Sequence, residues 1–277
     1  MDRILVPVDF SPDSESALKT ASLLAKKHNA QLYPLHMLDV HLASLNESET
    51  YIQEKVAFFY KMAEKRVKTF LEKEYLKGLS VSPIVKNFKI FSEINDVAKE
   101  LEIDLIVMGS HGASGLKEFF IGSNTEKVVR YSEVPVLVVK QELENVDFED
   151  IVIATDFSFN SIPAFKNVLK TIDSFNARAH IVYVNLPSEN FKTSFEMEKM
   201  ANDFYEEAEG NSDRIFETNF VCDRSVEEGI LNFSNIVGAD LITVITHGRK
   251  GLSHIFAGSI AEDITNHANL PLLTFKQ

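Results

Sequence analysis

The sequence predicts an α/β fold of two tandem, doubly wound domains, each a five-stranded, mostly parallel sheet with helices on both faces. Continuously apolar runs, such as Leu105–Met108 and Val136–Val139, are typical of strands that are buried on both faces of a sheet. Segments with helical periodicity separate these runs, as βαβ units require. The whole pattern occurs twice in 277 residues, a length that suits two domains of ordinary size.

The two copies align along most of their length. The matching segments are residues 4–11 with 151–158 at an offset of 147, and residues 104–112 with 240–248 at an offset of 136. The second copy is therefore 11 residues shorter between its second and fourth strands. We predict one domain over residues 1–141 and a second over residues 149–277, joined by the acidic segment Gln141–Glu149.

Local patterns predict the elements of the first copy. In chain order we expect strands at residues 4–8, 31–37, 81–88, 105–108 and 136–139, and helices at 12–27, 47–77, 93–102 and 124–131. Ser11 and Pro12 mark the first helix start, because proline is tolerated in the first turn. Asn29 and Ala30 form the turn that follows this helix. Apolar spacing predicts a long amphipathic helix over 47–77, whose counterpart is the shortened part of the second copy.

Composition and charge exclude several classes of partner. The net charge is −13, and no cluster of Lys and Arg stands out except Arg249-Lys250, so nucleic-acid binding is not expected. The same negative field repels a free nucleotide, so a phosphate ligand would depend on local N–H groups and on Mg²⁺. No apolar stretch approaches the ~20 residues of a membrane span, and the N-terminus lacks a signal-peptide pattern. We therefore expect a cytoplasmic protein that does not bind membranes.

A glycine motif follows the fourth strand of the first copy. The run Asp104-Leu-Ile-Val-Met-Gly109-Ser-His-Gly112 is separated by nine residues from Gly122-Ser123-Asn124-Thr125. Gly109 and Gly112 would let a ribose or phosphate approach the main chain, and Gly122-Ser123 opens a helix that offers free N–H donors. Because Asp9, Met37 and Gly109 close three strands, they are expected to face one crevice at the carboxyl edge of the sheet.

Each part of this motif also has a structural alternative. Ser123 and Glu126 have the spacing of a capping box, which needs no ligand. Met37 and Met108 could be core residues at strand ends, and Asp9 could cap the helix that follows it. The joint spacing of the glycines, in register with Asp9, is more specific to a ligand site than any single part.

The second copy departs from the motif at one position. Asp156, Gly248, Gly258 and Ser259 match their counterparts, but Ile245 replaces the first glycine. Because its branched side chain would occupy the space that a ribose needs, we predict weak or absent nucleotide binding in the second copy. Arg249-Lys250 could attract an anion there or form a solvated part of the loop.

No residue is predicted to be catalytic or to bind a metal. His111 and His247 recur at the same loop position, and His254 adds a third histidine, but no carboxylate or cysteine accompanies them at ligand spacing. The single cysteine, Cys222, excludes an internal disulfide and a cysteine-only metal site. Because it ends a predicted strand, we interpret it as a packed thiol.

These residues carry a resemblance to the universal stress protein family. The Gly109-x2-Gly112-x9-Gly122-Ser123 pattern between an Asp-Leu-Ile-Val-Met strand and a Val-Pro-Val-Leu-Val-Val strand is similar to that family, as is the opening Ile-Leu-Val-Pro-Val-Asp-Phe-Ser. The resemblance covers essentially the whole chain as two tandem domains. It implies an adenine nucleotide alpha hydrolase-like fold and a regulator of the stress response that binds ATP, ADP or AMP.

The resemblance also assigns roles to individual residues. It implies that Pro7 and Asp9 lie on the adenosine side, that Met37 presents backbone groups to the adenine, and that Met108 and Gly109 flank the ribose. It further implies that the phosphates contact the residues Gly112, Gly122, Ser123 and Asn124. In the family the last strand of each domain commonly joins two domains, so we expect Val136–Val139 and Leu272–Phe275 to pair in an internal pseudo-dimer. Whether two chains form a homodimer is left open.

Three functions are compatible with these patterns. The first is a cytoplasmic regulator that binds ATP mainly in its N-terminal domain. The second is a slow ATP hydrolase, although the sequence has no Gly-x4-Gly-Lys-Ser/Thr motif and no placed general base. The third is a scaffold or non-nucleotide binding protein that acts through the second domain or the long helix within 47–77.

Overall fold

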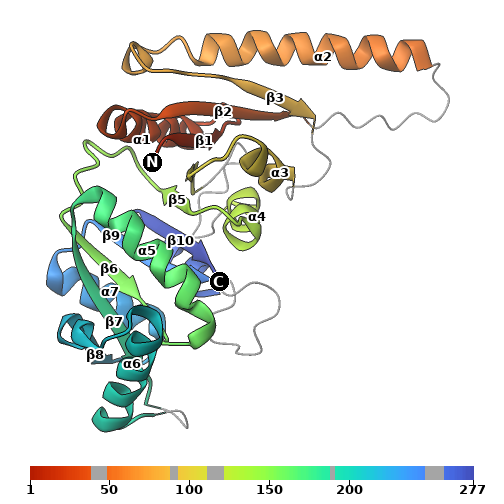
Figure 1. The fold of residues 1–277 in the computed structure, drawn as a ribbon. Helices are drawn as coiled ribbons and strands as arrows, with labels where there is room; N and C mark the ends of the chain where they lie inside the picture. The colour runs from red at the N-terminus through yellow and green to blue at the C-terminus, as the bar shows by residue number, and fades with distance from the viewer. Residues whose placement is uncertain (39–48, 88–92, 111–121, 188–190, 247–258) are drawn as a thin grey trace.

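The described strands form one ten-stranded sheet in the order β3-β2-β1-β4-β5-β10-β9-β6-β7-β8 (Figure 1). This computed structural model describes residues 1–38, 49–87, 93–110, 122–187, 191–246 and 259–277. Strand pairs are parallel within each half, and the pair β5–β10 at the centre is antiparallel. The predicted α/β class with a mostly parallel sheet is confirmed.

The N-terminal half follows the predicted order of elements. It contains β1 (Arg3–Pro7), α1 (Pro12–His28), β2 (Gln31–Leu38), α2 (Glu49–Phe70), the short 3₁₀ helix η1 (Glu74–Leu76), β3 (Ile84–Asn87), α3 (Glu93–Glu100), β4 (Leu105–Gly109), α4 (Ser123–Tyr131) and β5 (Val136–Val139). The prediction for β5 is confirmed at both ends, and those for β1, α1 and β2 within one residue.

Two elements of this half differ from the prediction by more than two residues. The helix expected over 47–77 ends at Phe70, and the chain then turns back to the sheet, where Leu76 is buried in the core. β3 begins at Ile84, not at Val81, because Pro83 has no N–H to donate to a strand ladder. Val81 forms an isolated bridge with Leu32 instead.

The C-terminal half repeats the same order. It contains β6 (Asp150–Ala154), the 3₁₀ helix η2 (Phe159–Ser161), α5 (Ile162–Phe175), β7 (Arg178–Asn185), α6 (Ser194–Glu209), the 3₁₀ helix η3 (Asp213–Glu217), β8 (Thr218–Cys222), α7 (Val226–Val237), β9 (Leu241–Thr246), α8 (Ser259–His267) and β10 (Leu272–Lys276). No helix among the described residues has the length and hydropathy needed to cross a membrane.

Two hydrophobic clusters cover the two faces of the sheet. One packs α1, α5 and α6 against one face and includes the fully buried Phe165 and Phe204. The other packs α3, α4, α7 and α8 against the opposite face and includes Val128 and Ile264. Neighbouring residues of a strand enter opposite clusters, as the two-residue period of a strand requires. Helices therefore cover both faces, as predicted.

The two halves join through their last strands, as the resemblance implied. Leu273 of β10 lies opposite Leu137 of β5, and Thr274 Oγ1 donates to the carbonyl oxygen of Val136 at 3.3 Å. Lys276 Nζ lies 3.4 Å from the carbonyl oxygen of Tyr131, the last residue of α4. The predicted internal pseudo-dimer is confirmed in this pairing, which uses both sheet edges inside one chain.

The acidic segment between the halves has no helix or strand but is packed. Val146 and Phe148 are buried, and Lys27 Nζ of α1 contacts the carbonyl oxygen of Val146 at 3.2 Å and the carboxylate of Asp147 at 2.9 Å. The Phe148 ring meets Phe175 of α5 edge-on, with 5.3 Å between centroids. The segment is thus fixed to the first helix of each half.

Candidate functional site

Strands β1, β2 and β4 end side by side at one edge of the N-terminal half. Pro7, the buried last residue of β1, lies opposite Leu35 of β2, and the backbone N–H of Val8 donates to the Leu35 carbonyl at 2.8 Å. β4 lies on the other side of β1 and ends at Gly109. Half-buried Asp9 follows directly after β1. In open α/β sheets, this carboxyl edge is where ligands bind.

Asp9 and Ser11 form a network that starts α1. Asp9 Oδ1 accepts hydrogen bonds from the Ser11 backbone N–H at 3.0 Å and from Ser11 Oγ at 2.5 Å. Ser11 Oγ in turn accepts from the backbone N–H of Ser14 at 3.1 Å, so Ser11 is the N-cap of α1. The alternative role of Asp9, support of the following helix, is therefore realised, and it acts through Ser11.

Gly109 lies against the first turn of α1. A Cβ at this position would lie 2.7 Å from both the carbonyl carbon and the carbonyl oxygen of Asp13, closer than real Cβ atoms approach. A side chain at position 109 would therefore push α1 away from β4. The Gly109 carbonyl oxygen also accepts a hydrogen bond from Thr125 Oγ1 of α4 at 2.8 Å. The glycine thus holds the starts of two helices at the end of β4.

The N-terminus of α4 is seated directly on this strand end. Gly122 is the N-cap, and its N–H donates to the Ser110 carbonyl at 2.7 Å, while its own carbonyl accepts from Glu126 at 2.9 Å. Ser123 and Asn124 are the exposed first residues of the helix. The cap has no side-chain hydrogen bond, so the capping-box interpretation of Ser123 is wrong. The first N–H groups of α4 have no carbonyl partner within the helix, as at any helix start, and Ser123 is its first residue.

The two methionines of the predicted site have different surroundings. Met108 is 6% exposed and packs in the cluster beneath α3 and α4, as its structural alternative expected. Met37 is half-buried near the carboxyl end of β2, opposite Lys86 of β3. Met37 is therefore the methionine with side-chain surface left for a ligand.

A cluster that the sequence did not reveal lies beside Asp9. His36 Nδ1 is 2.9 Å from the carbonyl oxygen of Val8, so Nδ1 carries the proton and donates it. The Phe10 ring lies 4.4 Å from the His36 ring and 4.1 Å beneath the Arg66 guanidinium of α2. Burial lowers the pKa of His36, and Arg66 lowers it further. This cluster places a neutral imidazole and one cation next to the Asp9 carboxylate.

The same edge of the C-terminal half is built differently. Asp156 Oδ1 accepts from the Ser158 N–H at 2.9 Å, but the Ser158 side chain caps nothing, and the 3₁₀ helix η2 replaces the first turn of the helix. Ile245, the counterpart of Gly109, is 6% exposed and packs in the core on the α5 side. Phe157, the counterpart of Phe10, is buried among Tyr183, Phe204, Tyr205 and Phe220.

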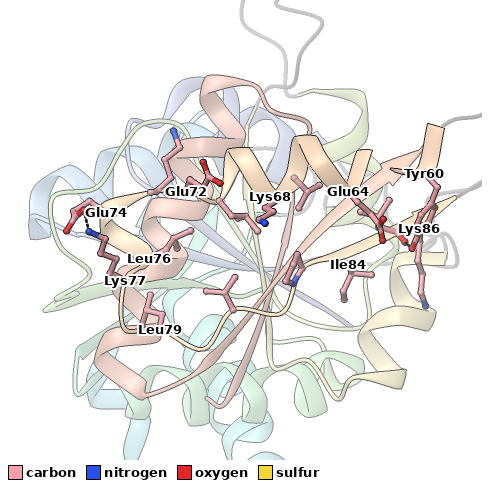
Figure 2. A pocket seen from close by; sticks show the side chains of 16 residues that line it. Tyr60, Glu64, Lys68, Glu72, Glu74, Leu76, Lys77, Leu79, Ile84 and Lys86 are labelled. Carbon is pink, nitrogen blue, oxygen red and sulfur yellow. Dashed lines mark hydrogen bonds and ion pairs between the residues drawn. The ribbon is translucent and has the colours of Figure 1, made fainter. Parts of the chain in front are cut away.

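A groove of about 1160 Å³ lies elsewhere, between α2 and the edge strand β3 (Figure 2). Its floor is apolar. Three of the four lysines that line it are paired, Lys77 with Glu74 at 2.6 Å, Lys86 with Glu100 at 3.0 Å and Lys73 with Glu15, whereas Lys68 forms no ion pair with a described residue. Tyr60 Oη donates to the outer carbonyl of Val85 at 2.7 Å. Together with Pro83 this blocks the strand edge, and no glycine lines the groove, so it lacks the close backbone approach of a phosphate site.

Some predicted residues lie outside the described part of the chain. These are Gly112, His111, His247, Gly248, Arg249, Lys250, His254 and Gly258. Within the described residues, no group of three His, Cys, Asp or Glu side chains is arranged to hold a metal ion. Cys222 does end a strand, β8, but it is exposed, so its interpretation as a packed thiol is wrong. β8 is the outer strand of the sheet, so no described strand lies beyond the thiol on that side.

Comparison with known proteins agrees with this geometry. The chain is 32% identical over 157 residues to a universal stress protein of Methanocaldococcus jannaschii, covering 50% of this chain and 95% of the relative. It is 37% identical over 146 residues to the universal stress protein YxiE of Bacillus subtilis, covering 50% of this chain and 99% of the relative. Each relative is about as long as one half of this chain.

A solved structure matches both halves together. A universal stress protein from Archaeoglobus fulgidus superposes with a TM-score of 0.66 at 22% identity, over 99% of this chain and 98% of the other, which shows a common fold. The family model described as the universal stress protein family matches residues 1–140 and again residues 147–276. The chain therefore belongs to the universal stress protein family, with two copies of the family's domain in tandem.

Proposed function

We propose that this protein is a stress-response regulator that binds an adenine nucleotide in its N-terminal domain, residues 1–141, and that the second domain, residues 149–277, binds little or none. The nucleotide is ATP or a close relative, carried with Mg²⁺. The base would lie toward Pro7, Asp9 and Met37, and the phosphates toward the start of α4. Gly112 would also contact the phosphates; this role rests on the sequence motif alone.

The observation that carries the proposal is the start of α4. Its N-cap is a glycine, its first two residues are exposed, and the Ser123 hydroxyl is not used for capping. The helix dipole and the first N–H groups therefore point toward the edge where β1 and β4 end. A phosphate placed there would meet donors for which the described residues provide no side-chain cap.

The distribution of charge also favours the first half. Residues 1–141 contain 18 Lys and Arg and 19 Asp and Glu, whereas residues 142–277 contain 10 and 22. The two halves thus have net charges of −1 and −12, which together give the −13 of the chain. An anionic ligand is repelled far less by the first half than by the second.

The test is to count nucleotides on the full chain. Nucleotide released by acid from the purified protein, and titration calorimetry with ATP and Mg²⁺, should give one adenine nucleotide per chain. Ser123→Ala should weaken binding roughly 10-fold, because a hydrogen bond to a charged phosphate is lost. Ser259→Ala, at the matching position of α8, should leave the affinity unchanged. Absence of binding at millimolar ATP would overturn the proposal.

A further inference from the structure

The two helices at the ends of the sheet carry opposite charge. α2 and α6 each follow the second strand of their half, and they lie at opposite ends of the molecule (Figure 1). α2 contains five basic and three acidic residues, whereas α6 contains one basic and six acidic residues. α2 is fixed to edge strand β3 through Tyr60, and α6 to edge strand β8 through a 2.6 Å hydrogen bond between Tyr205 and Thr218.

Each of these helices also exposes large apolar side chains. On α2, Phe58 is 60% exposed and Met62 is 53% exposed, one turn apart on the face opposite the buried Ala63 and Val67. On α6, Phe195 is 75% exposed, again opposite the buried side of its helix. Phe58 and Met62 together give α2 an exposed apolar patch flanked by charges, a composition that is found at contact surfaces.

The exposed charges beside these apolar residues are available for a partner. Lys61, Lys65 and Lys68 on α2 are exposed and form no ion pair with a described residue. On α6, Glu209 pairs with Arg214, but other exposed carboxylates form no ion pair with a described residue; they include Glu198, Asp203, Glu206 and Glu207. The two faces thus combine exposed apolar side chains with unpaired charges of opposite sign, and Phe195 lies at the N-terminal end of α6.

We propose that two copies of this chain associate through these helices, with α2 of one copy against α6 of the other. In a two-fold arrangement the copies lie side by side with their ends reversed. The α2–α6 contact then occurs twice, once at each end, and closes the assembly as a dimer. Pairing of α2 with α2, or of α6 with α6, would place like charges together. The pairing edges β5 and β10 are already used within the chain, so a second copy must use another surface. This inference does not depend on nucleotide binding.

Sedimentation of the full chain at low salt tests the contact. The wild type should be a dimer, and raising the salt from about 0.1 M to about 1 M should weaken it, because the screening length falls from ~10 Å to ~3 Å. Reversing α2 (Lys61→Glu, Lys65→Glu, Lys68→Glu) should weaken the dimer roughly 100-fold. Reversing α6 (Glu198→Lys, Asp203→Lys, Glu206→Lys) should do the same.

The decisive experiment mixes the variant whose α2 charges are reversed with the variant whose α6 charges are reversed. Each alone carries helices of one sign and should be monomeric, whereas the 1:1 mixture has complementary α2 and α6 faces and should form dimers again. A matched control reverses three exposed lysines elsewhere, Lys26, Lys166 and Lys170, and should leave the dimer intact. Thermal melting confirms that every variant is folded. A monomeric wild type, or a mixture of folded variants that stays monomeric, would overturn the proposal.

Discussion

The two halves of this chain share one topology and differ most where β4 and β9 end. At the end of β4, the absence of a side chain at Gly109 lets the first turn of α1 lie close to the strand. A Cβ added at this position would be only 2.7 Å from the carbonyl carbon of Asp13. At the end of β9, Ile245 fills the core, and η2 stands in place of the first turn of the helix. Gly109 therefore has a packing role, whether or not a ligand lies beside it. It also decides how the first helix begins.

The difference extends to the residues around each helix start. In the first half Ser11 caps α1 and is held by Asp9, whereas in the second half α5 begins at Ile162, three residues later than the repeat predicts. Phe10 and Phe157 share a left-handed backbone, with φ of 68° and 54°. The ring of Phe10 lies beneath an exposed arginine, while that of Phe157 is enclosed by aromatic side chains. One edge stays polar and the other is filled by core.

The largest effect is expected from Ile245→Gly, which copies the first half into the second. Loss of this buried side chain should lower the free energy of unfolding by about 4 kcal/mol, measured in urea. The helix start of the second half would still be the uncapped η2, whereas α1 begins with a turn capped by Ser11. We therefore expect the protein to bind one nucleotide per chain, as the wild type does. Ile236→Gly, on an exposed site of α7, should cost about 1 kcal/mol. A second bound nucleotide would show that Ile245 alone blocks the site, as the ribose argument predicts.

The converse change, Gly109→Ala, should have the second largest effect on stability. Because the added methyl group meets the backbone of Asp13, α1 must shift, at a cost of about 2 kcal/mol in unfolding free energy. Calorimetry should also show weaker nucleotide binding, since α1 and α4 both start at this strand end. Gly78→Ala is the control: its Cβ meets nothing within 4 Å, so only its φ of +80° is strained. Unchanged stability of Gly109→Ala would refute the packing role.

The sequence was informative where a pattern is local and repeated. The buried strands follow from apolar runs and from the duplicated motif, whereas the joining of Val136–Val139 with Leu272–Phe275 was expected from the resemblance to the family. The end of α2 at Phe70 could not be read from periodicity, because apolar spacing continues through Leu76 while the chain turns back to the sheet. Tertiary packing decided that boundary.

The candidate site was predictable only in part for the same reason. The motif located Asp9 and the start of α4, but it left a capping box at Ser123 open as an alternative, because nothing local shows that Gly122 takes the cap. The contact between Phe10 and Arg66 joins residues 56 positions apart, and it has no sequence signature. Cys222 ends a strand as predicted, yet its exposure depends on β8 being the outer edge of the sheet.

A smaller effect should separate the two serines that begin the helices. Ser11→Ala removes an N-cap and should cost about 1 kcal/mol. Ser158→Ala should cost less than about 0.5 kcal/mol, since its side chain makes no capping bond. Urea unfolding of both variants in parallel measures the difference. Equal losses of unfolding free energy would mean that Ser11 stabilises its helix no more than Ser158 does, although only Ser11 makes a capping hydrogen bond.

The smallest expected effect is a pH dependence of the stability that comes from His36, at the carboxyl edge of the first half. Burial lowers the pKa of His36, whereas its counterpart Tyr183 has a pKa raised by burial and does not titrate near neutrality. Below the unfolded-state pKa of about 6.5, the unfolded chain binds the proton more readily, so stability falls as the pH drops. Above that pH, His36 is neutral in both states and contributes no pH dependence.

His28 has a lowered pKa for the same reason, so the wild type alone cannot isolate His36. His36→Asn keeps a side-chain N–H that can donate to the Val8 carbonyl but does not titrate. Thermal melting between pH 5 and pH 8 should therefore show a shallower loss of stability at low pH for this variant than for the wild type, with matching values near neutrality. Parallel curves for the two proteins would mean that the imidazole beside Asp9 is protonated equally in the folded and unfolded chains, and that this polar edge is as open to water as an unfolded segment.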